Sequence, residues 1–172
     1  MSHDGEMARL FLDFAEPLTA EAWRAIDDRV MGGASRSRLR HDAQGHAVFE
    51  GEVSLAHGGG FASVRSPAGD FDDGDAREIQ IEARGTGGPF KLALFTDDGF
   101  DSIAWQCGFD PAPGAGWQLL RLPLAAFEPR HRGRAVTGAP PLGAQRVRQL
   151  GLMTAGRTAR PFVLEIRAIS RA

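Results

Sequence analysis

Apolar and polar residues alternate along many short segments of this chain, with the period of two that β-strands show. The segment 162–169 is a clear case. There Phe162, Leu164 and Ile166 share one parity, while the opposite parity includes Glu165 and Arg167. Such alternation predicts strands that bury one face and expose the other.

Extended to the whole chain, this pattern predicts about ten short strands separated by Gly-, Pro- and Asp-rich turns. The predicted strands cover 10–17, 34–40, 46–55, 61–66, 78–84, 90–96, 102–109, 117–122, 147–153 and 162–169. Helix is expected only as single turns, one capped by Thr19 and one within 123–127. The segment 128–144 lacks periodicity and is predicted to be a long surface loop. We therefore predict an all-β fold, an antiparallel β-sandwich of the jelly-roll kind with very little helix.

One hairpin is specified in more detail by strand parity. With the turn centred near residues 43–44, Arg36 and Arg38 fall on the same face as Glu50 and Glu52. The arginine row is then either a charge-matched outer face or an anion-binding stripe. Ser35, Ser37 and Leu39 fall on the apolar face, and inward hydroxyl groups need hydrogen-bond partners.

Composition narrows the class of protein. The 172 residues are 42% hydrophobic and 24% charged, which is typical of one globular domain, predicted over 1–172 with a core of about 8–170. A net charge of −2 argues against nucleic-acid binding. The single cysteine, Cys107, excludes an internal disulfide, and no segment is long and apolar enough for membrane insertion. With no signal-peptide pattern at the N-terminus, we expect a cytoplasmic location.

Two glycine-containing stretches, 27–37 and 58–66, carry most of the candidate chemistry. Asp27 and Asp28 are adjacent, so in an extended chain they lie on opposite faces and do not form an acid–base pair of the glycosidase type. Their role is either structural or ligand-contacting. A hydrogen-bonded cluster of Asp28, Ser35, Ser37, Ser63 and Arg65 is expected where the two stretches meet.

Familiar catalytic and cofactor motifs do not match. The His57–Gly60 stretch lacks the accompanying G-x-S-x-G nucleophile turn, and the acidic stretch 70–75 does not fit a calcium-binding EF-hand loop. The stretch 70–75 is therefore either a solvated turn or a structural Ca²⁺ site that does not have EF-hand geometry. The five histidines show no metal-ligand spacing, and phosphate-binding glycine motifs are absent. We expect no cofactor, no metal and no catalytic residue.

A set of landmarks resembles the complex I intermediate-associated protein 30 family over roughly residues 8–170. The landmarks are Trp23, Asp28, 31–33, Ser35, Ser37, 49–51, 59–66, 83–85, Lys91-Leu92, Trp117, Leu122-Pro123, Phe127, Arg132-Gly133 and 161–166. The resemblance implies a galactose-binding-like β-sandwich. It also implies a function like that of the mitochondrial members, which are assembly chaperones for respiratory complex I. It carries over no catalytic residues.

Three functional hypotheses follow. The first is a non-catalytic protein-interaction or assembly module, whose candidate partners include respiratory-complex subunits. The second is a carbohydrate- or small-molecule-binding module, with Trp23, Trp105, Gln106 and Arg65 as its binding residues. The third is an uncharacterised hydrolase-type enzyme that uses Asp27 or Asp28 with Arg65.

Overall fold

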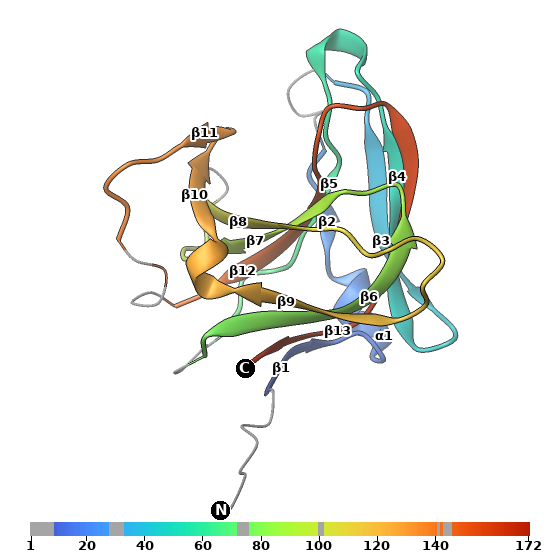
Figure 1. The fold of residues 1–172 in the computed structure, drawn as a ribbon, viewed down its shortest axis with the longest axis horizontal. Helices are drawn as coiled ribbons and strands as arrows, with labels where there is room; N and C mark the ends of the chain where they lie inside the picture. Colours follow the sequence, from blue (N-terminus) through green and yellow to red (C-terminus); the bar gives the residue numbers. More distant parts are fainter. Residues whose placement is uncertain (1–8, 28–32, 72–75, 100–101, 141, 143–145) are drawn as a thin grey trace, which may run out of the picture.

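The computed structural model describes residues 9–27, 33–71, 76–99, 102–140, 142 and 146–172. Over these residues the chain forms two antiparallel β-sheets that pack on each other around one hydrophobic core (Figure 1). This confirms the predicted antiparallel β-sandwich.

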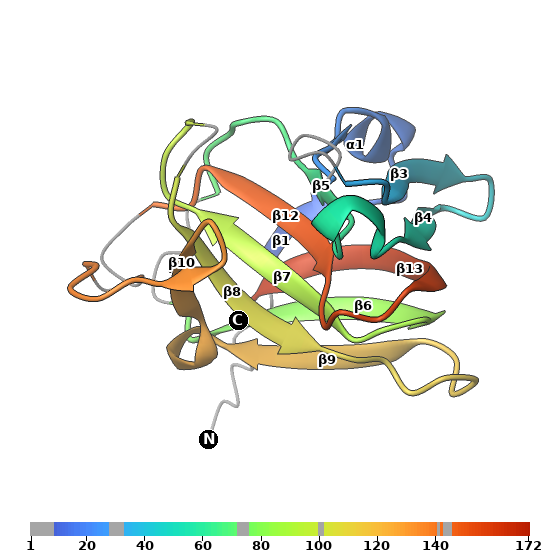
Figure 2. The same cartoon turned by 90° about the horizontal axis from the view of Figure 1, so that it is seen from above.

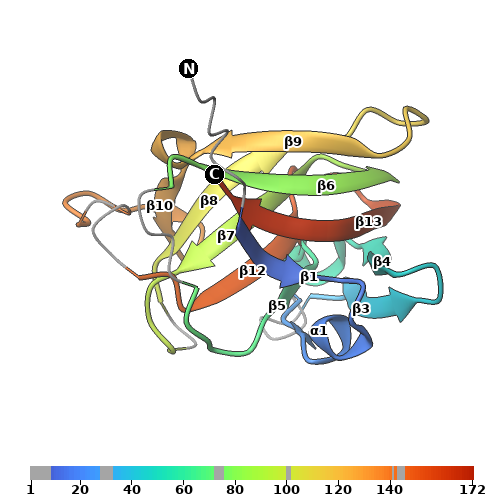
Figure 3. The same ribbon diagram turned by 90° about the horizontal axis from the view of Figure 1, so that it is seen from below.

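The first sheet has its strands in the order β3, β4, β13, β6 and β9, and β1 also pairs with β13. The bounds are β1 Arg9–Asp13, β3 Arg36–Asp42, β4 His46–Val53, β6 Glu78–Thr86, β9 Gln118–Pro123 and β13 Arg160–Arg171. Figure 3 shows β9, β6, β13 and β1 side by side. The long strand β13 therefore lies at the centre of this sheet.

The second sheet has the order β11, β10, β8, β7, β12, β5 and β2. The bounds are β2 Arg24–Ala25, β5 Ser63–Arg65, β7 Phe90–Phe95, β8 Ala104–Phe109, β10 Glu128–His131, β11 Arg134–Ala135 and β12 Gln149–Thr154. Figure 2 shows β8, β7 and β12 running side by side across the middle of this sheet. The helical elements with assigned bounds are short: α1 (Pro17–Glu21), η2 (Ala56–Gly58) and η3 (Leu124–Ala126).

Three local predictions were wrong. The first strand ends at Asp13, and α1 begins at Pro17, so Thr19 lies inside the helix and is not its cap. Proline suits the first helical position, where its missing N–H and fixed φ cost nothing. The third error is the segment 128–144, where β10 and β11 form a small hairpin at the edge of the second sheet.

The hydrophobic core is centred on aromatic residues from both sheets. Phe49 of β4 and Phe162 of β13 have ring centroids 4.8 Å apart, and Phe90 of β7 lies 6.1 Å from Phe162 and 6.4 Å from Phe49. All three side chains are fully buried. Burial of such rings is the main favourable contribution to sandwich stability.

The face assignment predicted for the β3–β4 hairpin is confirmed. Arg36 pairs with Glu52, and Arg38 with Glu50. Arg38 donates to Glu50 at 2.7 Å, so these arginines belong to a charge-matched outer face. At the turn, Gly45 has a φ of +91°, which residues with a side chain adopt only with strain.

Glycines in two of the family landmarks allow the neighbouring backbone to approach closely. A Cβ atom on Gly51 would lie 1.9 Å from the carbonyl oxygen of Arg36, and one on Gly85 would lie 2.2 Å from that of Val163. Atoms of a neighbouring backbone cannot move away as a flexible side chain can. The glycines of the 49–51 and 83–85 motifs are thus explained by strand packing.

Candidate functional site

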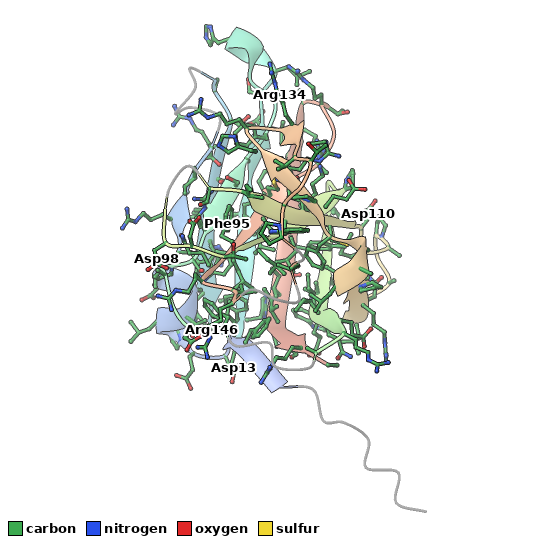
Figure 4. The ribbon with its side chains drawn as sticks, turned by 90° about the vertical axis from the view of Figure 1, so that its left-hand side faces the viewer. Asp13, Phe95, Asp98, Asp110, Arg134 and Arg146 are labelled. Carbon is green, nitrogen blue, oxygen red and sulfur yellow. The ribbon has the colours of Figure 1, made fainter. Side chains whose placement is uncertain are left out.

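An open groove of ≈680 Å³ crosses the outer face of the second sheet. Residues of β5, β12, β7, β8 and β10 line it, together with Ile26 and Phe61. Figure 4 views the molecule from the left-hand side of Figure 1 and shows Phe95, a residue of the groove, near the middle. Arg134 of β11 lies above Phe95 in this view.

The groove exists because small residues occupy neighbouring positions on adjacent strands. Gly151 of β12 pairs with Ala93 of β7, and Ala104 of β8 pairs with Phe95 one pleat further along. Strand parity places these residues on one face of the sheet, opposite to the fully buried Leu92 and Leu94. Larger side chains flank this small-residue floor, and a hollow remains between them.

The charged residues that line the groove are all basic, as far as the described part of the chain shows. They are Arg65, Lys91, Arg130 and Arg132. Lys91 is the only lysine in the protein, and its ammonium group donates to Gln106 Oε1 at 3.4 Å. Gln106 in turn donates to Met153 Sδ at 3.5 Å, so three neighbouring strands are linked across the groove.

Arg65 forms part of one wall. Its guanidinium lies over the ring of Phe95, 3.9 Å from the centroid. Desolvation lowers the pKa of Arg65, and the nearby Asp97 carboxylate opposes that effect. Arg65 and Ile26 also line a second, smaller hollow of ≈330 Å³ beside the first. They therefore form the ridge between two neighbouring depressions.

Asp27 is the centre of the hydrogen-bonded cluster. Asp28, which was predicted to belong to this cluster, lies outside the described residues. The Asp27 carboxylate is 2% exposed. It accepts hydrogen bonds from the backbone N–H groups of Ser37 at 3.0 Å and Ser63 at 2.8 Å, and from the Ser37 hydroxyl. Because β3 and β5 belong to different sheets, Asp27 joins the two sheets.

The other predicted cluster residues are only partly brought together. Ser35 bonds Ser54, donating to its carbonyl oxygen and accepting from its N–H at 2.9 Å. The Ser63 hydroxyl donates to the carbonyl oxygen of Ile26. Arg65 extends toward Phe95 in the groove. The serines thus act within the fold, whereas Arg65 lies at the site.

The two tryptophans that were predicted as binding residues are buried. Trp105 pairs with Leu94 and shares its core-facing parity, which leaves the side chain 8% exposed. Trp23 is 7% exposed and packs against Phe14, with centroids 6.0 Å apart. Neither therefore presents a ring face to a ligand in this structure. Gln106, with the opposite parity on β8, lines the groove.

Sequence reasoning did not single out Lys91, Phe95 or Met153 as site residues, and it interpreted the stretch 130–134 as a solvated loop, with phosphate contact as the alternative. Arg130 was assigned to a loop, so its place beside β8 was not visible. For Lys91 a signal existed, because Lys91, Ala93 and Phe95 have the parity opposite to the predicted core residues of their strand. That parity did not distinguish a groove from any other solvent-facing surface.

The outer face of the first sheet carries a different arrangement. Trp117 is contacted by two guanidinium groups, Arg84 at 4.5 Å and Arg167 at 4.1 Å from the ring centroid. Glu165 accepts from Arg84 at 2.6 Å and bonds His46 at 2.8 Å. On this face, positive side chains pair with negative side chains on neighbouring strands, so their charges largely neutralise one another.

The described residues contain neither a metal-ligand cluster nor a membrane-spanning helix. No three His, Cys, Asp or Glu side chains gather in the arrangement of a metal site within that part of the chain. None of the helices in the described ranges is long and apolar enough to cross a membrane.

The family model described as complex I intermediate-associated protein 30 matches residues 12–166. The chain belongs to this family. An uncharacterized protein of Schizosaccharomyces pombe is 28% identical over an alignment of 150 residues, and the match covers 76% of this chain and 67% of that protein. The resemblance predicted from the sequence landmarks is therefore confirmed.

Solved structures of similar fold include carbohydrate-binding proteins. A family 11 carbohydrate-binding module from Clostridium thermocellum, in complex with a β-1,3-1,4-mixed-linked tetrasaccharide, has a TM-score of 0.62 at 16% identity and covers 95% of this chain and 94% of that one. The same module of a cellulosomal cellulase gives 0.63 at 15% identity, with the same coverage. An agarase gives 0.60 at 13% identity, covering 96% of this chain and 24% of the agarase. At these identities the likeness concerns the fold alone.

Proposed function

We propose that the protein is a non-catalytic binding protein that holds a segment of a partner polypeptide in the groove of the second sheet. The groove itself is the observation that carries this proposal. It is open, it crosses five strands, and its floor of Gly151, Ala93 and Ala104 leaves room for a chain laid across it.

The hydroxyl groups that were candidates for chemistry have structural partners. Ser37 donates to Asp27, and Ser63 donates to the carbonyl oxygen of Ile26. Asp27 is itself surrounded by backbone and hydroxyl donors and joins the two sheets. These contacts support a binding role over a hydrolase that uses Asp27.

Family membership supports the kind of partner. The complex I intermediate-associated protein 30 family is associated with assembly of a respiratory complex. We therefore propose an assembly factor whose partner is a subunit or assembly intermediate of a multi-subunit complex, with respiratory complex I as the first to test.

A carbohydrate- or small-molecule-binding module is the second candidate, and the solved carbohydrate-binding modules of the same fold favour it. Sugar sites commonly use exposed aromatic faces. In the groove the face of Phe95 is covered by Arg65, and Trp105 of the same sheet is in the core. These positions favour a polypeptide over a sugar.

Filling the groove tests the proposal. Ala104→Trp places a large ring on the floor, and Leu119→Trp places the same ring on the first sheet, where Leu119 is 52% exposed. We expect the wild type and Leu119→Trp to recover the same protein partners from cells of the natural host, including respiratory-complex subunits. Ala104→Trp should lose them while keeping the wild-type melting temperature within a few degrees.

A glycan and metabolite screen by thermal shift distinguishes carbohydrate or small-molecule binding from polypeptide binding. A ligand that binds only the native state raises the melting temperature when its concentration exceeds its dissociation constant. A sugar that stabilises the wild type but not Ala104→Trp would replace the polypeptide proposal with a carbohydrate-binding function. Partner recovery that is equal with both tryptophan variants would show that the groove does not bind the polypeptide partner.

A further inference from the structure

The groove concentrates positive charge on a protein whose net charge is −2. Lys91 lies on the central strand β7, Arg130 on β10 and Arg65 on β5, so basic groups occur at both ends and in the middle. This distribution differs from that of the other large charged surface of the molecule.

On the first sheet, arginines are placed opposite carboxylates. Arg38 pairs with Glu50 across β3 and β4, and Arg84 pairs with Glu165 across β6 and β13. In the groove, Lys91 has uncharged cross-strand neighbours, since it faces Met153 on one side and Gly108 on the other.

Arg130, like Lys91, has only uncharged neighbours across the strands. Its partners in the sheet are Ala104 and Ala135. The Arg130 guanidinium contacts Glu128 on its own strand at 3.1 Å, and that carboxylate is 70% exposed. An exposed pair of this kind contributes little and is readily exchanged for another anion. The cross-strand pairing that neutralises the first sheet is thus not repeated at Lys91 or Arg130.

The dimensions of the groove define the length of its occupant. From β10 to β5 there are four strand spacings of about 4.8 Å each, which is roughly 19 Å. An extended chain rises about 3.3 Å per residue, so roughly six residues span this distance. The small residues Gly151 and Ala93 on the floor suit an extended backbone. The Gln106 amide accepts from Lys91 and donates to Met153, and it has a second N–H and a second lone pair for main-chain hydrogen bonds of the occupant.

We propose that the occupant of the groove is an acidic segment of a partner polypeptide, about six residues long and extended. Its carboxylates pair with Lys91 and Arg130, while Arg65, held over Phe95, forms the wall at the far end. This inference rests on the proposed binding function and adds the chemistry of the partner.

Peptide binding measured by fluorescence polarisation tests the charge requirement. The probes are three labelled peptides of equal length in which Ala alternates with Glu, with Gln or with Lys. We expect the Glu peptide to bind the wild type at least roughly tenfold more tightly than the other two, since several ion pairs each contribute a part of that factor. Its affinity should fall as salt is added, because salt screens partly exposed charges.

Charge variants show which residues bind the Glu peptide. The double variant Lys91→Glu/Arg130→Glu should weaken binding of the Glu peptide by roughly tenfold or more, and Lys91→Arg should retain it. Arg36→Glu reverses one charge on the first sheet, half the charge change of the double variant, and should leave binding unchanged. Thermal melting of each variant checks the fold, and Lys91→Gln provides a milder substitution if the double variant unfolds.

The outcomes separate this inference from the proposed function. If the Gln peptide binds as well as the Glu peptide, or the double variant binds normally, the acidic assignment is wrong. Should Ala104→Trp still abolish partner recovery in that case, the binding function stands without it. Tighter binding of polygalacturonate or of a single-stranded oligonucleotide than of the Glu peptide, in the same assay, would also overturn the acidic-polypeptide assignment.

Discussion

At the scale of single residues, the buried carboxylate of Asp27 is the most consequential group in the two glycine-containing stretches. It is 2% exposed and satisfies two backbone N–H groups and one hydroxyl from strands of different sheets. A buried ion is costly unless it is well hydrogen-bonded, and here the donors converge on it. Its role in the described structure is to connect the sheets.

Asp27→Asn should lower the free energy of unfolding by about 1–3 kcal/mol. The amide has only one acceptor oxygen, so a backbone N–H of Ser37 or Ser63 loses its partner. Chemical denaturation measures the change, and Asp110→Asn, at an exposed position, is the matched control. Equal small effects at both positions would mean that Asp27 does not hold the sheets together.

At the scale of elements, the close approach of neighbouring strands explains the glycines of the family landmarks. Gly51 of β4 faces the backbone of β3, and Gly85 of β6 faces the backbone of β13. In both cases the obstacle is a carbonyl oxygen, and a whole strand would have to move to admit a methyl group.

Gly51→Ala should therefore destabilise the protein by about 3 kcal/mol, because its Cβ would overlap the Arg36 carbonyl. The control is Gly108→Ala on β8, where the nearest atom to an added Cβ is 3.8 Å away. That variant should stay within about 0.5 kcal/mol of the wild type. Urea unfolding of both proteins makes the comparison, and similar losses would contradict the steric explanation.

Strand β13 also carries a pH-dependent contact. The hydrogen bond from Arg84 holds the pKa of Glu165 below its ordinary value of 4.5, burial opposes this, and the bond with His46 adds to it. A carboxyl group with a lowered folded-state pKa stabilises the protein above 4.5. That stabilisation is lost as the pH falls through the folded-state value.

Glu165→Gln should consequently be less stable than the wild type at neutral pH, with a difference that shrinks as the pH falls below 4.5. Denaturation curves over a pH series measure this difference. Glu52→Gln, at an exposed position of the same sheet, should show a small difference at all pH values. A gap between Glu165→Gln and wild type that is constant with pH would show that the Arg84–Glu165 contact does not stabilise the fold.

At the scale of the whole molecule, the aromatic core joins the two layers and so supports the groove on the opposite face of the second sheet. Phe162 contacts Phe49 within its own sheet and Phe90 of the other sheet. Phe90 is on β7, the strand that also carries Lys91 and Ala93 of the groove. Core packing therefore positions the floor of the site.

Phe162→Ala should cost about 3–5 kcal/mol of unfolding free energy, because it leaves a cavity at the junction of the sheets. Val163→Ala, the next residue, is 39% exposed and should change the stability by no more than about 0.5 kcal/mol. Calorimetry on the two variants tests the pair. A small loss for Phe162→Ala would mean that the core can repack around the cavity.

The amino-acid sequence by itself determined the local features. Strand alternation specified the sandwich class, and parity around a short turn specified which residues of the β3–β4 hairpin share a face, because both depend on residues close together in the chain. The landmark motifs specified the family. By contrast, the sequence left open whether Asp27 or Asp28 is buried and whether Trp105 faces a ligand or the core.

Only the tertiary structure decided the groove. Its floor requires that β12, late in the chain, lie between β7 and β5, so that Gly151 comes beside Ala93. It also requires β10 to pair with β8 so that Arg130 reaches the edge of the hollow. These pairings join segments that are distant in sequence. The alternation within each strand carries no information about which strand will be its neighbour.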